Sequence, residues 1–197
     1  MLKRGLILRI IPYSDSARII KCLVDGEGQQ ALFTRISKKT GGSGHLQTGH
    51  FIEFRVTDKK TGIKSIKESR LDSALGANFL VPQAYGVWLF TLELLNKSLQ
   101  DNFNIPGLTK KMDQYYSHLS HGTIPFEPII PLIILSVSYG IFDQKNIGIQ
   151  ASAAAHSGLN IFGIQTATNV PMVSFDQILT GFTNHFAIQQ IESLDLL

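Results

Sequence analysis

The sequence contains a single cysteine, and this scarcity excludes two kinds of structural support. One thiol cannot form an internal disulfide, nor can it supply a metal site built from several cysteines. Cys22 lies in an apolar segment between Ile20 and Val24, so we expect it to be a small buried residue. The fold must then depend on its core, and an apolar content of 44% in 197 residues is ordinary for a chain with one.

Long uninterrupted apolar runs are also missing. Residues 129–142 are the most apolar stretch, but they are too few to span a membrane and are interrupted by a proline and a glycine, so we expect a buried core helix. The apolar stretch near the N-terminus is broken at Arg9 and Pro12, too early for a signal peptide with a cleavage site. We therefore expect a cytoplasmic protein with no membrane partner.

Recognisable catalytic motifs are absent. Residues 41–45 read Gly-Gly-Ser-Gly-His, which lacks the final glycine and the strand-to-helix setting of a nucleophile elbow. His118 and His121 have helical spacing, but no third ligand completes a metal site with them. Glu93 lies on an apolar helix, where a single glutamate is usually solvated or paired. We expect no enzyme activity, no cofactor and no bound metal.

Acidic residues are scarce at the start of the chain. Residues 1–70 hold 14 lysines and arginines against six carboxylates, a net charge of +8, whereas the remainder carries −5. A basic N-terminal module joined to an acidic, apolar one suggests that the first meets a polyanion and the second meets protein.

The basic part has the pattern of five short strands. Residues 50–57 alternate between apolar and charged side chains with a period of two. We expect the first strand to stop at Pro12 and the second to restart at Arg18, with glycine-rich turns later in the module. Closure into an OB-type barrel would remove exposed sheet edges, so we expect an OB-type domain at residues 1–72. The expected strands cover residues 5–11, 18–24, 30–36, 50–57 and 63–70.

After this barrel the apolar residues recur with a helical period, so we expect an all-α domain at residues 73–197 and an α+β fold class. Ser174 has the character of a helix N-cap. Residues 145–173 are rich in small and polar residues and predict an irregular connection. The expected helices cover residues 82–102, 106–121, 126–142 and 175–186.

Two loops repeat the sequence Lys-Lys-Thr-Gly, at residues 38–41 and 59–62. Loop lysines make point-charge contacts to phosphates without reading base sequence. Either loop alone is better explained as a solvated turn, but together with the basic strand residues, Lys67 among them, the two favour a nucleic-acid groove. The candidate DNA-binding residues are Arg9, Lys21, Arg35, Lys38, Lys39, Arg55, Lys59, Lys60 and Lys64.

Exposed aromatic rings would strengthen this interpretation, because bases stack on rings in proteins that bind single strands. Tyr13 and Phe33 are the candidates. We expect Phe33 to pack into the core.

Residues 5–20, with Pro-Tyr-Ser-Asp-Ser-Ala-Arg at positions 12–18, resemble the opening of the bacterial recombination mediator RecO. The basic loop after the third expected strand and the sequence Glu-Ser-Arg at residues 68–70 show the same likeness. The resemblance continues through residues 88–95, 135–140 and 188–197. It implies a DNA-binding OB barrel followed by a helical domain.

The resemblance also implies activities and partners. RecO-like proteins bind single- and double-stranded DNA, anneal complementary strands and help to load recombinase during repair, in the bacterial cytoplasm at the nucleoid. Their partners are a RecR-like protein and the acidic C-terminal tail of single-stranded-DNA-binding protein.

Two departures from the family pattern matter. Many members carry four zinc-binding cysteines after the third long helix, but residues 143–173 contain none, so we expect no zinc. The helical half is acidic and has only four lysines, which weighs against capture of an acidic tail. Lys110 and Lys111 are the candidates for that contact.

Two other functions fit the same residues. The barrel could dock an acidic protein, as part of an interaction scaffold, or it could bind RNA in translation or decay.

Overall fold

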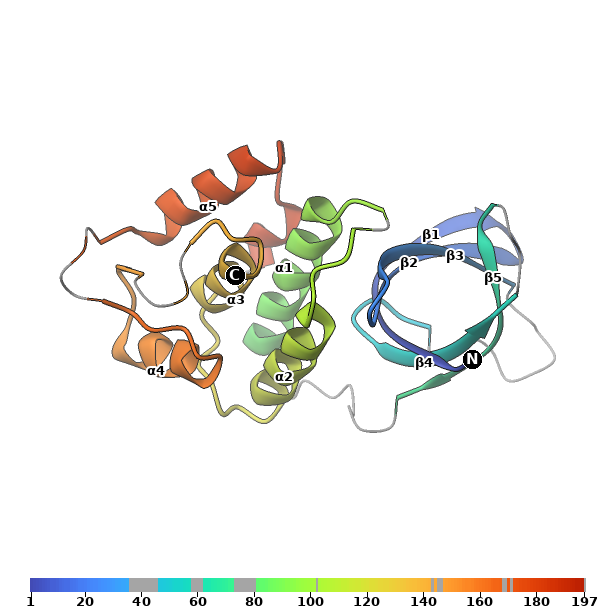
Figure 1. Ribbon diagram of the computed structural model, residues 1–197, viewed down its shortest axis with the longest axis horizontal. Coiled ribbons are helices and arrows are strands. Elements are labelled where there is room, and N and C mark those ends of the chain that lie inside the picture. The colour runs from blue at the N-terminus through green and yellow to red at the C-terminus, as the bar shows by residue number, and fades with distance from the viewer. Residues whose placement is uncertain are drawn as a thin grey trace. The chain divides into compact units, whose positions relative to one another are not determined.

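The computed structural model describes residues 1–35, 46–57, 62–72, 81–101, 103–142, 144, 147–167, 170 and 172–196. Strands occupy the N-terminal part and helices the rest (Figure 1). The strands are β1 (Lys3–Ser14), β2 (Ala17–Val24), β3 (Gly28–Arg35), β4 (Phe51–Val56) and β5 (Lys64–Leu71). The helices are α1 (Pro82–Ser98), α2 (Leu108–Ser120), α3 (Ile129–Ser138), α4 (Ala153–Ile161), α5 (Phe175–His185) and the 3-10 helix η1 (Glu192–Leu196).

Internal contacts divide the chain into two compact units. Unit 1 consists of Met1–Ala77 and Leu99–Lys110, and unit 2 consists of Asn78–Ser98 and Lys111–Leu197. The boundary expected after residue 72 stays a prediction. None of the helices among the described residues is both long and apolar enough to cross a membrane.

The strands of unit 1 form a closed barrel in the order β1-β2-β3-β5-β4. β1 closes it by pairing with β2 on one side and, through residues 3–6, with β4 on the other. Every pair is antiparallel except β3 with β5, which is parallel. The barrel followed by helices confirms the expected α+β class with an N-terminal OB-type domain.

The barrel is filled by alternate residues of its strands, because successive side chains of a strand point to opposite faces. Cys22 is buried in this interior, as expected, and the burial raises the pKa of its thiol. The buried residues of the cluster are Ile7, Ile20, Cys22, Val24, Leu32, Ile52 and Phe54.

One expected strand boundary is wrong. β1 does not stop at Pro12 but continues to Ser14, with Pro12 opposite Arg18 on β2. The register shifts between Pro12 and Ser14. A proline has no N–H to donate, and sheets tolerate it where the ladder is irregular.

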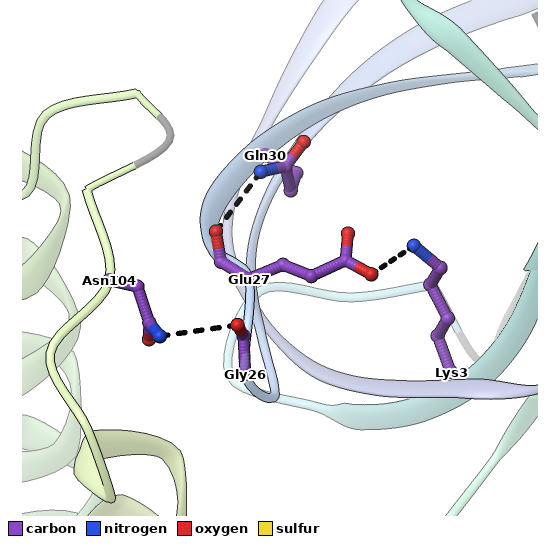
Figure 2. A network of polar contacts seen from close by, with 5 residues as sticks. All are labelled: Lys3, Gly26, Glu27, Gln30 and Asn104. Atoms are coloured by element: carbon purple, nitrogen blue, oxygen red, sulfur yellow. Dashed lines mark hydrogen bonds and ion pairs between the residues drawn. The ribbon is translucent and has the colours of Figure 1, made fainter.

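The segment Leu99–Lys110 packs on the hairpin between β2 and β3, inside unit 1. The Gln29 side chain donates to the Asp101 carboxylate over 2.8 Å. The Asn104 amide donates to the Gly26 carbonyl over 3.1 Å (Figure 2). α1 ends at Ser98, earlier than expected, and Asp101 instead forms a parallel bridge with Gln29.

The same hairpin is fixed to β1. The Lys3 ammonium pairs with the Glu27 carboxylate, and Gln30 donates to the Glu27 carbonyl over 3.2 Å (Figure 2). Beside it, Gly28 has a φ of +77°, and a Cβ atom there would lie only 2.2 Å from the Phe103 carbonyl oxygen. Glycine is required at this position for both reasons.

Unit 2 is built around aromatic and aliphatic residues of its helices. Trp88 on α1 is 1% exposed and packs on Tyr116 of α2 with 4.9 Å between ring centroids. The most apolar helix, α3, is almost wholly buried, as expected for a core helix. At α5, Ser174 and Gln177 form a capping box, which confirms the expected N-cap.

The region expected to be irregular contains a helix, α4. The Ser152 hydroxyl accepts a hydrogen bond from the Ala155 N–H over 3.0 Å and caps the helix start. Three alanines follow this cap, and alanine has the highest intrinsic helix propensity. Gly158 lets α4 approach Ile130, whose Cδ1 would lie 3.1 Å from an added Cβ atom.

Glu93 holds the end of the chain against α1. Its carboxylate accepts hydrogen bonds from the backbone N–H groups of Glu192 and Ser193, each over 2.7 Å, and pairs with Lys97 at 2.7 Å. Burial alone would raise the pKa of Glu93, but these hydrogen bonds together lower it below its ordinary value.

Replacing Gly28 with alanine should destabilise unit 1 much more than the same change at Gly26. Both glycines have positive φ, so each variant carries a conformational cost of about 1–2 kcal/mol. Only Gly28→Ala also forces a Cβ atom against Phe103, since nothing lies within 4 Å of the Gly26 position. Denaturant unfolding followed by circular dichroism measures the difference, and equal losses would contradict the close approach.

Acid should release the C-terminal segment. Because the folded-state pKa of Glu93 is lowered, its contribution to stability is present above the ordinary glutamate pKa and is lost as pH falls through the lowered folded-state pKa. The protection of the Glu192 and Ser193 amides from hydrogen exchange, measured relative to the intrinsic rate at each pH, should therefore fall at low pH in the wild type. In Glu93→Gln this protection should already be reduced at neutral pH, and full protection there would contradict the assignment.

Candidate nucleic-acid interface

The outward side chains of β1, β2 and β3 form a continuous surface, which we call the outer face. Register places Arg9 opposite Lys21, and Lys21 opposite Ala31. In the neighbouring row Ile11 lies opposite Ile19, and that row continues through Phe33 on β3 to Ser65 on β5. Side chains opposite each other on adjacent strands share a face, so basic residues here flank an apolar row.

A hollow of about 690 Å³ lies on this outer face. Its apolar and aromatic lining comes from Tyr13, Ile19, Phe33, Ile63 and Ile66. Tyr13 is 67% exposed, and its ring stands edge to face with Phe33, with centroids 5.8 Å apart and planes 84° apart. The expectation that Phe33 packs into the barrel core is therefore wrong. Phe33 is half-buried on the outside of the barrel.

Two cations complete the lining of the hollow. Arg35 ends β3 and Lys67 lies on β5, and both are exposed. Within the described part of the chain, neither forms an ion pair, and the same holds for Arg9 and Lys21. The described residues that line the hollow include no carboxylate. The outer face is thus positively charged around an aromatic floor.

Other basic residues of the barrel have structural partners. Arg4 donates to Asp72 over 2.6 Å and lies over the Phe51 ring, 5.0 Å from its centroid. Arg18 donates to backbone carbonyls at the turn between β1 and β2. These cations stabilise the barrel, so their charge is less available to a ligand than the charge of the cations on the outer face.

The candidate Arg55 lies on β4, which β5 separates from β3 in the barrel order. Its guanidinium is 3.1 Å from the Glu68 carboxylate, and Arg70 pairs with Glu53 on the same two strands. The structure therefore does not bring Arg55 together with the hollow. Its role in DNA binding stays a prediction.

The remaining candidates differ in how far the structure describes them. Lys64 begins β5, beside Ser65 of the hollow, and is half-buried. Lys38, Lys39, Lys59 and Lys60 lie outside the described residues.

Sequence reasoning gave too little weight to several residues of the hollow. The sequence predicts Lys67 as a basic strand residue but not as a candidate DNA-binding residue, and it predicts no role in the site for Ile19 or Ile63. The available signal was the position of Lys67 two residues after Ser65 on the same strand, which places both on one face.

The candidates for a partner contact lie side by side in the first turns of α2. Lys110 is exposed. Lys111 is half-buried, and its ammonium donates to the Ser138 hydroxyl over 3.2 Å. Burial lowers the pKa of Lys111.

The residues present do not suit a family-type zinc site. Residues 143–173 contain no cysteine in the sequence, and Cys22 lies inside the barrel. Across the ranges that the structure describes, no three His, Cys, Asp or Glu residues cluster in a way that could hold a metal ion.

Comparison with known proteins identifies the barrel. Residues 1–74 match the family model described as Recombination protein O N terminal. No curated protein matches the chain. The match covers the strands that carry the outer face, and it supports a role in DNA repair and recombination. The OB-type barrel at the N-terminus is therefore similar to the N-terminal domain of recombination protein O.

Proposed function

We propose that this protein is a recombination mediator that binds single- and double-stranded DNA, anneals complementary strands and assists recombinase loading. One observation carries the proposal: cations without ion pairs in the described part of the chain gather around an aromatic hollow on the outer face. OB folds bind oligonucleotides on the face of strands 2 and 3, close to the loops that join strands 1 to 2 and 4 to 5. The hollow involves β2, β3 and residues next to both of these connections.

The charge arrangement supports contact with the sugar-phosphate chain instead of base-edge reading. Each lysine or arginine that neutralises a phosphate releases condensed counterions, which gives affinity that weakens with salt and depends little on sequence. The outer face supplies Arg9, Lys21, Arg35 and Lys67 for this purpose. Lys38, Lys39, Lys59, Lys60, Lys64 and Arg55 remain further candidates in the same proposal.

Such a protein would act without breaking or making covalent bonds, in the cytoplasm at the bacterial nucleoid. Pairing of two strands requires that their mutual repulsion be screened, and a positively charged barrel surface can do this. We extend the proposal to a RecR-like partner and, through Lys110 and Lys111, to an acidic tail. Of these two lysines, Lys110 has the more accessible charge, because Lys111 is engaged by Ser138.

Replacing Arg9, Lys21, Arg35 and Lys67 together with glutamine should weaken DNA binding at least about tenfold near physiological salt. The slope of log K against log salt for single strands should fall by about 0.7 for each cation that no longer neutralises a phosphate. Fluorescence anisotropy across a salt series measures both quantities. Arg70→Gln is the matched control, since Arg70 is exposed but paired with Glu53, and its affinity should stay within about twofold of the wild type.

Annealing of complementary strands in the same salt series tests the mediator role. The wild type should accelerate pairing, and the fourfold glutamine variant should not. Retained partner binding without any acceleration would favour the interaction scaffold, and tighter binding to RNA than to DNA of equal length would favour an RNA-binding protein. Full DNA affinity after reversal of Lys38, Lys39, Lys59 and Lys60 to glutamate would remove those four lysines from the site.

A further inference from the structure

The hollow has a composition that phosphate contacts alone do not require. Point charges suffice to bind a sugar-phosphate chain, yet here Tyr13 exposes 67% of its surface to solvent beside the half-buried Phe33. In an edge-to-face pair neither ring covers both faces of the other, so ring surface stays accessible. A flat apolar ligand can stack there.

Position on the strands keeps this aromatic surface in place. Tyr13 lies where the β1 register shifts, between Pro12 and Ser14, and Phe33 is held by pairing with Ile19 on one side and Ser65 on the other. The ring floor is therefore carried by the barrel strands themselves. A preorganised floor loses little conformational entropy when a ligand binds.

The charges at the hollow select the kind of flat ligand. Arg35 and Lys67 both line it, with no carboxylate among the described lining residues, so an aromatic group attached to anions fits better than a neutral or cationic one. A nucleotide within a strand has this chemistry, with a phosphate on each side of its base. In a duplex the bases are stacked inside the helix and cannot reach a ring without being unpaired.

We propose that the hollow is a base-stacking subsite, in which Tyr13 and Phe33 receive an unpaired base while Arg35 and Lys67 contact the flanking phosphates. This base-stacking subsite rests on the proposed DNA binding. It adds a preference, because a subsite for an unpaired base makes the barrel bind single-stranded DNA more tightly than duplex DNA. Stacking is tolerant of sequence, because every base has a π face.

Tyr13→Ala should weaken binding of the full chain to a single-stranded oligonucleotide by about 5- to 100-fold, the range expected for loss of one stacked base. Duplex affinity should change by less than about twofold. Tyr13→Phe should keep the wild-type affinity, because it keeps the ring. Tyr85→Ala on α1 is the matched control, an exposed tyrosine outside the barrel, and should behave as the wild type.

A 2-aminopurine base in the oligonucleotide reports stacking directly, since its fluorescence is quenched when it stacks. Binding should quench it with the wild type and with Tyr13→Phe, and less with Tyr13→Ala. The salt dependence separates the two kinds of contact: Tyr13→Ala should lower the affinity without changing the salt slope, whereas Arg35→Gln should reduce the slope by about 0.7.

Equal losses of single-strand and duplex affinity in Tyr13→Ala, or unchanged quenching, would overturn the stacking subsite. If Tyr13→Ala changes nothing while the fourfold glutamine variant loses DNA, the proposed function stands and this inference fails. Loss of an acidic peptide ligand with unchanged DNA binding would assign the hollow to a protein partner and also overturn it. Because Tyr13 is exposed, the variant should fold, which its circular dichroism spectrum checks.

Discussion

Closure of five strands into a barrel is the constraint on which the other features of unit 1 depend. A closed sheet has an inside and an outside, and the side chains of each strand point alternately to the inside and to the outside. Once Ile20, Cys22 and Leu32 fill the interior, Lys21 and Phe33 have to face outward. The aromatic hollow and its cations are thus a geometrical consequence of the same pattern that builds the core.

The distribution of charge says more about ligand binding than its total. Arg4, Arg18 and Arg70 each have partners that stabilise the barrel, whereas Arg35 and Lys67 flank apolar ring surface without an ion pair in the described part of the chain. A net charge of +8 includes both kinds of residue. Only residues of the second kind are available to neutralise phosphates and so to release the counterions condensed on a nucleic-acid strand.

The sequence allowed the barrel to be predicted, because period-two patterns and turn residues are local signals. It was less informative where tertiary contacts decide the outcome. Pro12 did not end β1, since an irregular register absorbs it, and Phe33 did not enter the core, since strand pairing puts it on the outside. α4 was missed although Ser152 and the alanines after it gave a local signal. The backbone N–H groups of Glu192 and Ser193 that donate to Glu93 lie about a hundred residues away, beyond any local pattern.

Unit 1 is discontinuous along the chain, because Leu99–Lys110 packs on the β2–β3 hairpin after the whole of α1 has intervened. A ribosome synthesises the chain from its N-terminus, so all five strands emerge before this last piece. During that interval the Gln29 side chain has not yet met Asp101, and the hairpin backbone at Gly28 is not yet covered by Phe103. Unit 1 can therefore be completed only after the chain has been synthesised beyond α1.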